Sequence, residues 1–360
     1  VYLREAWGGL PAFLYGWKCL LVMDPGLTAA LAAGFAAYVG VLVPLSPSGI
    51  KLVGITTVLA LAAANLRGTP LAAGIIRLLT AGKLYLLGLL VFSGFISGLG
   101  DWGHFLPLLA RRPGSAPLLP ALAGAVVVAF FSFGGWWEMS KIAGEVREPS
   151  KTLPRAFALG IGLVTLAYIL TSAVFLYLVP IESMASGETF AAQAATVLLG
   201  PPGAKALAAL VALCILSSLA TITTLCPRVY YAMARDGSFL AAVGRLDPRT
   251  GTPVRAIIVQ TVLACLLLMI GTFDQIMAYF IFVTVAFLGL SVAGLFVIRR
   301  RGGSAPGFAT PGFPLPAVVF LGSLVVVLVL LAGSSPMQAA LGAGVVALGA
   351  PAFYLMRRFA

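Results

Sequence analysis

Charged residues are scarce in this sequence: Asp, Glu, Lys and Arg make up 9% of its 360 residues, whereas 61% are hydrophobic. An ordinary soluble domain is about a quarter charged and about half apolar. A water-soluble globule of this length could not hide so much apolar surface. The composition therefore excludes a cytoplasmic enzyme, a nucleic-acid-binding protein and a secreted disulfide scaffold. It indicates a membrane protein that crosses the bilayer several times.

Metal-binding and redox residues are also few. The single histidine, His104, has no ligand residues near it in the sequence. Four cysteines lie in apolar stretches without CxxC spacing: Cys19, Cys214, Cys226 and Cys265. We therefore expect reduced cysteines that pack, with no disulfide and no metal site. A GxxxxGK[ST] phosphate-binding loop is absent from the sequence, which argues against an ATP-driven pump.

What the sequence does contain is a series of long apolar runs. A helix needs about 20 apolar residues to cross a hydrocarbon core of roughly 30 Å. These runs are apolar on all sides rather than alternating, which predicts helices and not a barrel. Ten runs qualify: 10–43, 50–66, 71–99, 118–143, 153–179, 203–233, 254–272, 274–298, 314–332 and 338–356.

The basic residues between these runs predict the orientation. Seventeen of the 23 Lys and Arg residues, Lys141 among them, fall on one side of the membrane, and Lys18 and Lys83 fall within spans. The other side receives Lys51, Arg111, Arg112 and Lys205. Basic loops stay in the cytoplasm, so the first side is expected to be cytoplasmic. With ten spans, both ends of the chain are expected to be cytoplasmic.

The fourth run contains adjacent glycines, Gly134 and Gly135, halfway along its length. A helix broken at membrane depth is tolerated where it lines a cavity or packs on protein. Carbonyls freed by the break could accept hydrogen bonds from an ammonium group, and the amides of the next half-helix could bind a carboxylate. The alternative is that the two glycines only allow close helix packing.

Several motifs together resemble the amino acid–polyamine–organocation family of permeases, and above all its L-type amino acid transporter branch. Phe-Ser-Phe-Gly-Gly-Trp, followed by Glu-Val-x-x-Pro-x-x-x-Leu-Pro-Arg-Ala, resembles the sixth-helix signature of that family. The motifs occupy residues 131–136 and 145–156, 228–237 with 251–254, 1–8 with 16–17, and 306–314. The resemblance covers the whole chain in the right order.

The resemblance implies an all-α membrane protein with the LeuT-like inverted-repeat fold, and the ten spans would correspond to family helices three to twelve. We therefore expect one permease domain over residues 1–360, with residues 118–298 as the second five-helix repeat. The chain begins with Val1, and we expect an amino-terminal part with helices one and two to be missing. The fragment alone is not expected to transport.

The implied activity is secondary active transport of amino acids by alternating access across the cell membrane, as an exchanger or a proton-coupled permease, without enzyme chemistry and therefore without need of a cofactor. Amino acids and membrane lipid are the expected partners, and nucleic acid is not. Animal L-type relatives have a disulfide-linked partner subunit, but no cysteine falls in an outer loop here, so none is expected. A membrane-embedded amino acid sensor or channel and a non-functional truncated permease remain alternatives.

The resemblance also implies which residues of the broken helix meet the substrate. Phe131, Ser132, Phe133, Gly134 and Gly135 are expected to bind the substrate, whose amino group would contact the unwound backbone. Phe131 matches the aromatic gate of relatives. Trp136 matches the bulky residue just beyond the break and is the second expected gate residue. Without the resemblance, ordinary core packing would explain Phe131 and Trp136.

Lys83 lies about 18 Å from the nearer end of its run, too deep for its side chain to reach water. A charge at that depth costs roughly 2.5–3.5 kcal/mol, so Lys83 must face a polar cavity or a partner. The resemblance places it where sodium-coupled relatives bind sodium, which implies a role in cation or proton coupling. A static counter-charge is the alternative. Ser217, Ser218 and Thr221 are its expected polar neighbours.

Two acidic residues depart from the family pattern. Glu138 lies just past the break, where it could pair with Lys141 at i, i+3 or act as a cation-attracting or proton-relaying acid. Asp24 precedes Pro25 and Gly26 within the first span. We interpret Asp24 as marking a kink or the outer end of a helix, and not a proton site.

Overall fold

A computed structural model describes residues 2–106, 117–185, 189–237, 239–270, 273–302, 310–334 and 336–359. Every regular element in these ranges is helical. The α-helices are α1 (Tyr2–Trp7), α2 (Gly9–Lys18), α3 (Asp24–Leu42), α4 (Pro47–Leu66), α5 (Thr69–Ile96), α6 (Leu118–Ser132), α7 (Pro149–Leu178), α8 (Phe190–Leu199), α9 (Gly203–Leu225), α10 (Pro227–Arg235), α11 (Val254–Ile270), α12 (Phe273–Arg300), α13 (Leu315–Ser334), α14 (Pro336–Ala347) and α15 (Gly349–Phe359). A π-helical segment, η1 (Cys19–Met23), joins α2 to α3, and the 3₁₀ helices are η2 (Trp102–Phe105), η3 (Trp136–Glu145), η4 (Ile181–Ala185) and η5 (Ala241–Val243).

The helices confirm an all-α membrane protein with several spans. Within the described ranges, seven helices are long and apolar enough to cross a membrane: Gly9–Leu42, Pro47–Leu66, Pro70–Ile96, Pro149–Leu178, Gly203–Arg235, Ile281–Arg300 and Leu315–Gly333. The other three predicted runs are helical but shorter or interrupted. Run 118–143 breaks between α6 and η3, run 254–272 contains the 17-residue α11, and run 338–356 divides between α14 and α15.

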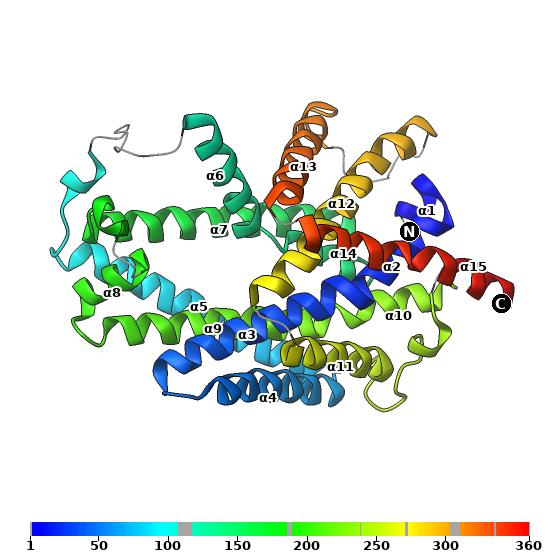
Figure 1. Ribbon diagram of the computed structural model, residues 1–360, viewed down its shortest axis with the longest axis horizontal. Helices are drawn as coiled ribbons and strands as arrows, with labels where there is room; N and C mark the ends of the chain where they lie inside the picture. The colour runs from blue at the N-terminus through cyan, green and yellow to red at the C-terminus, as the bar shows by residue number, and fades with distance from the viewer. Residues whose placement is uncertain are drawn as a thin grey trace.

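The centre of the molecule is α3, which packs against α4, α9, α11 and α12 (Figure 1). Its sequence is rich in alanine, and Ala29, Ala32 and Ala36 are fully buried. Small side chains let helix backbones approach closely. A methyl group added at Gly54 of α4 would lie 3.3 Å from the carbonyl oxygen of Ala32, so this crossing depends on the glycine.

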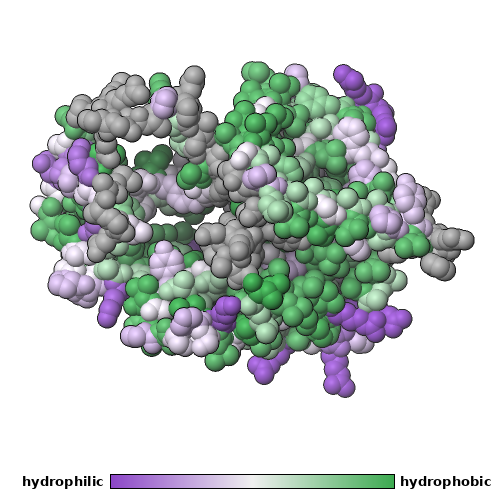
Figure 2. All heavy atoms as spheres, in the orientation of Figure 1, coloured by the Kyte–Doolittle hydropathy of each residue, from purple (hydrophilic) through white to green (hydrophobic). Residues whose placement is uncertain are grey.

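The outer helices present apolar side chains to their surroundings. Leu78 on α5 is 74% exposed and Leu159 on α7 is 75% exposed. Figure 2 shows hydrophobic side chains over most of the coloured surface of one face, and hydrophilic side chains chiefly towards its edges. Such a surface suits a lipid environment, since soluble monomers rarely expose large continuous apolar patches.

The long helix Gly9–Leu42 is irregular near the centre of the molecule, and this irregularity helps to position the site. The π-helical segment η1 widens the long helix Gly9–Leu42 just before Asp24 and Pro25. Insertions of this kind leave backbone groups unpaired and are frequent at functional sites. Asp24 therefore lies inside a continuous helical span, and the prediction that it could mark an outer helix end is wrong.

Candidate functional site

The predicted break in the fourth run is confirmed. Helix α6 ends at Ser132, residues 133–135 form a turn, and η3 begins at Trp136. Gly135 has a φ of +99°, a left-handed conformation that costs a residue with a Cβ energy and that glycine adopts freely. The Glu138 amide donates to the Gly135 carbonyl at 3.0 Å and starts the new helix. Gly135 thus permits the turn that separates α6 from η3.

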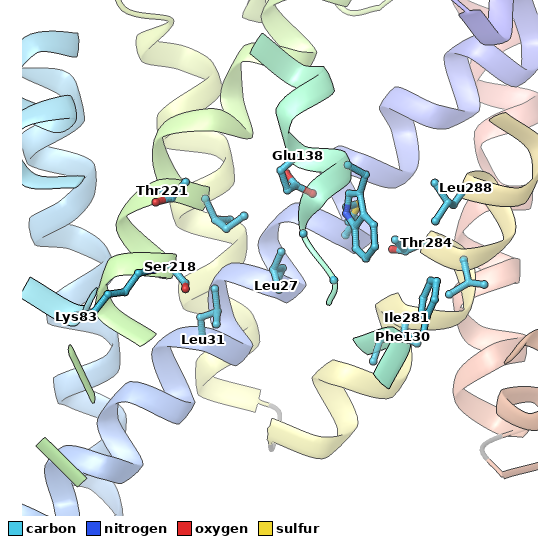
Figure 3. A pocket seen from close by; sticks show the side chains of 16 residues that line it. Leu27, Leu31, Lys83, Phe130, Glu138, Ser218, Thr221, Ile281, Thr284 and Leu288 are labelled. Carbon is cyan, nitrogen blue, oxygen red and sulfur yellow. The ribbon is translucent and has the colours of Figure 1, made fainter. Parts of the chain in front are cut away.

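A cavity of about 460 Å³ lies beside this turn and is bounded by η1, α3, α5, α6, η3, α9 and α12 (Figure 3). Its wall is mostly apolar, with a few polar residues. The apolar lining residues are Met23, Leu27, Leu31, Phe130, Trp137, Ile222, Ile281, Val285 and Leu288. The others are Lys83, Gly134, Gly135, Glu138, Ser218, Thr221 and Thr284. A mainly apolar cavity with a few placed polar groups is typical of a small-molecule site.

Lys83 is one of the residues that line this mostly apolar cavity, and its expected role in cation or proton coupling stays a prediction. It is half-buried on α5, and Figure 3 shows it beside Ser218. Among the described residues it has no hydrogen bond or ion pair. Ser218 and Thr221 line the same cavity, whereas Ser217 is buried behind it, 3.3 Å from the hydroxyl of Thr80.

The predicted residues of the broken helix divide into two groups. Gly134 and Gly135 line the cavity, but Ser132, Phe133 and Trp136 are not among its lining residues. Tyr168 of α7 donates its hydroxyl to the Ser132 carbonyl at 2.6 Å and packs edge-on against Phe133. The side chain of Phe131 lies outside the part of the chain that the structure describes, so its expected role as a gate stays a prediction.

Trp136 instead packs on aromatic rings outside the cavity. Its ring lies 6.4 Å from Phe157 of α7 and 6.0 Å from Phe320 of α13. The aromatic residues that line the cavity are Phe130 and Trp137, whose rings stack at 6.2 Å. Sequence reasoning missed both. A turn of unknown geometry after the double glycine made it impossible to tell which of two adjacent tryptophans faces inward.

Three buried charged residues and a cysteine lie next to the cavity. We call this group, Asp24, Glu138, Lys141 and Cys226, the acid–lysine cluster. The Lys141 ammonium lies 2.8 Å from Asp24 Oδ1, 2.6 Å from Glu138 Oε2 and 3.2 Å from Cys226 Sγ. The three charged side chains are 5% exposed or less. The i, i+3 pairing of Glu138 with Lys141 is thereby confirmed, but Lys141 lies buried in η3 and not in a loop between spans as expected.

The cluster continues through a chain of polar contacts. The Tyr230 hydroxyl lies 2.9 Å from Asp24 Oδ2 and 2.9 Å from Gln260 Oε1. The Gln260 amide donates to Thr28 Oγ1 at 3.1 Å. These contacts join α3, η3, α10 and α11, four segments that are far apart in the sequence. In the sequence, these contacts are indicated only by single polar residues within apolar spans. Such residues do not show which of them pair with one another.

The acid–lysine cluster also resembles a metal site in its donor atoms. One ligand atom each of Asp24, Glu138 and Cys226 lies within 4.8 Å of the others. The Lys141 ammonium, however, contacts all three residues and places a positive charge between the two carboxylates. A metal ion would have to displace this ammonium, so the donor set fits lysine better than a metal.

A third buried lysine, Lys18, sits near the end of α2. It is 2% exposed, and its ammonium donates to Met23 Sδ at 2.9 Å. The ammonium also lies 4.6 Å from the ring centre of Tyr15 and 5.6 Å from that of Phe287. Aromatic faces attract cations most strongly where water is excluded, which accounts for this burial.

Comparison with known proteins gives a consistent result. Residues 1–350 match the amino acid permease family. A cystine/glutamate transporter of Pongo abelii is 27% identical to this chain, over 98% of the chain and 71% of the relative. The serine/threonine exchanger SteT of Bacillus subtilis (strain 168) is 27% identical over 99% and 81%. The large neutral amino acids transporter small subunit 2 of Homo sapiens is 26% identical over 98% and 67%.

Proposed function

Because this chain belongs to the amino acid permease family, we propose that it moves amino acids across the cell membrane by alternating access, either in exchange for another amino acid or together with protons. The family match confirms the resemblance drawn from the sequence motifs. The relatives named above are transporters and exchangers, and the chain is likewise an amino acid transporter and not an enzyme.

The proposal rests on one observation: the glycine turn and Lys83 line the same cavity. The substrate ammonium would be held by the backbone of the turn at Gly134 and Gly135, which line the cavity; the Gly135 carbonyl also accepts from the Glu138 amide. Their neighbours Ser132 and Phe133 would shape the turn, since the Ser132 carbonyl accepts from the Tyr168 hydroxyl and the Phe133 ring packs against Tyr168. Phe131 would act as the gate over the bound substrate, and Trp136 would support η3 from the side of α7 and α13.

Lys83 would couple transport to a cation or proton. It lines the cavity at mid-span without an acidic partner among the described residues. An ammonium there can stand in for a bound cation, and loss of its proton would remove a positive charge from the substrate cavity. Ser218 and Thr221 line the cavity near it, and Ser217 would support them from behind.

The proposed membrane orientation and subunit assembly rest on the distribution of basic residues and cysteines in the sequence. The excess of basic residues on one side supports cytoplasmic placement of both ends of this chain. All four cysteines lie inside helices or at a helix end, and Cys19 and Cys226 are fully buried. We therefore propose that no disulfide-linked partner subunit is required. That residues 118–298 form one of two inverted repeats stays a prediction.

Proteoliposomes provide the test of this function. The protein would be reconstituted and given labelled amino acids with an unlabelled amino acid inside, with a pH gradient, or with neither. Uptake that requires internal amino acid indicates exchange, and uptake that requires the gradient indicates proton coupling. Binding without uptake in any of these conditions would contradict the proposal and favour an amino acid sensor.

A further inference from the structure

A second cavity, of about 350 Å³, is lined by the end of α4, the junction of α9 with α10, the start of α11 and the segment that joins α10 to α11. Its described lining residues do not overlap with those of the central cavity. The polar lining residues are Asn65, Thr224, Arg228, Tyr231, Arg235 and Thr252. Because the described residues of this lining include two arginines and no acidic residue, we call it the arginine cavity. The charge of its wall favours an anion as ligand.

The two arginines share one face of α10. Arg228, Tyr231 and Arg235 occupy positions i, i+3 and i+7, a spacing that places side chains in one row along a helix. The Arg235 guanidinium donates to the Tyr231 hydroxyl oxygen at 3.2 Å, and its central carbon lies 5.9 Å from the centre of the tyrosine ring. Tyrosine is neutral, so it orients this guanidinium without cancelling its charge. Guanidinium groups present several N–H donors in a geometry that suits the oxygens of a phosphate.

The carboxylates closest in sequence to the lining residues are engaged outside the arginine cavity. Asp236 follows Arg235 and lies 3.5 Å from a guanidinium nitrogen of Arg4. Asp247 lies in the segment before α11, and its Oδ2 accepts from the Thr250 amide at 3.0 Å and from the Thr250 hydroxyl at 2.7 Å. Neither carboxylate belongs to the described lining. The arginines therefore set the sign of the charge at this wall.

An exposed apolar face of α11 begins beside the arginine cavity. Ile257 lines the cavity. The exposed side chains that follow it on α11 include Ile258, Val262, Leu266 and Met269. Their spacing of four, four and three residues places them along one side of the helix. A phospholipid has an acyl chain for such a face as well as a phosphate group for the cavity, whereas inorganic phosphate uses only the cavity.

The arginine cavity lies on the basic side of the molecule. Exposed basic residues in the segment between α10 and α11, and at the start of α11, are Arg245, Arg249 and Arg255. Figure 2 shows hydrophilic side chains gathered at the edge of the molecule where Figure 1 places this segment. This side is the proposed cytoplasmic side, and the cytoplasmic leaflet of a cell membrane carries anionic lipids.

We propose that the arginine cavity binds the phosphate group of an anionic phospholipid from the cytoplasmic leaflet, with Arg228 and Arg235 on the phosphate oxygens. The two residues are about 10 Å apart along the axis of α10, and their long side chains reach one phosphate group between them. One acyl chain lies along the exposed apolar face of α11, so the bound lipid bridges α10 and α11. The inference does not depend on transport, because the two cavities have separate linings.

Thermal unfolding of the purified protein in detergent provides the test, because a ligand that binds the folded state raises the midpoint. We expect dioleoylphosphatidylglycerol to raise the midpoint at a concentration about tenfold lower than dioleoylphosphatidylcholine, whose choline group neutralises the phosphate. Inorganic phosphate at the same concentration should leave the midpoint unchanged. Equal effects of the two lipids would overturn the proposal. An equal rise with inorganic phosphate would overturn the lipid assignment and indicate a site for a free anion.

Matched variants assign the effect to the arginine cavity. Arg235→Gln removes one charge from an exposed side chain and is expected to raise the required concentration of phosphatidylglycerol about fivefold. Arg228→Gln should act in the same direction. Arg300→Gln removes the same charge from an exposed position at the end of α12, outside the cavity, and should leave the response unchanged. An unchanged response in both cavity variants, or an equal loss in Arg300→Gln, would overturn the proposal.

Discussion

Lys141 and Lys83 both carry an ammonium group into the interior of the helical bundle, one from η3 and the other from α5. Lys141 is completely surrounded, with Asp24 at 2.8 Å, Glu138 at 2.6 Å and a side chain that is 1% exposed. Lys83 lines an open cavity and has no acidic partner in the described ranges. A charge whose partners are built into the fold has a structural role, while a charge without them is available to respond to a ligand or a proton.

The difference between Lys141 and Lys83 predicts that Lys141→Met has the largest effect on stability. The substitution leaves Asp24 and Glu138 buried without their counter-charge, and breaking a buried pair in this way costs about 3–5 kcal/mol of unfolding free energy. Thermal unfolding in detergent would show a large fall in the midpoint. Lys83→Met is the matched control and should lower the unfolding free energy by less than about 1 kcal/mol. Similar losses in the two variants would remove the distinction between the lysines.

For transport we expect the opposite ranking. Lys83→Met should lower the rate of uptake into proteoliposomes at least tenfold, which corresponds to about 1.4 kcal/mol, with little change in stability. Lys83→Arg sharpens the test because arginine keeps its charge and does not release its proton. Retained uptake in Lys83→Arg indicates a resident cation, and lost uptake indicates a proton switch. Full activity of Lys83→Met would contradict a coupling role.

A smaller effect on stability than that of Lys141→Met is expected at the turn that lies between the two lysines in the sequence. Gly135 has a φ of +99°, so Gly135→Ala should cost roughly 1–2 kcal/mol and shift both the cavity wall and η3. Gly160→Ala in α7 meets no heavy atom within 4 Å and should be neutral or stabilising by up to about 1 kcal/mol. Unfolding midpoints of the two variants check this. Equal midpoints would show that the turn tolerates a side chain.

The features that the sequence predicted correctly all have local signals. The double glycine predicts the break at 133–135, and a lone lysine deep within an apolar span predicts a polar cavity or a partner for its ammonium group. The partnership of Asp24 with Lys141 spans 117 residues, and a single sequence does not say which helices pack together. The choice between Trp136 and Trp137 depended on the rotation of η3 after the turn, which changes the inward face by roughly a third of a circle per residue.

Cys226 gives the acid–lysine cluster a further property. Its thiol is fully buried against Lys141 and 3.7 Å from the Glu138 carboxylate. Any motion that carries η3 away from α9 uncovers this sulfur. The thiol of the unmodified chain can therefore report this motion. The rate at which a maleimide labels the peptide around residue 226 would measure how often η3 moves away from α9.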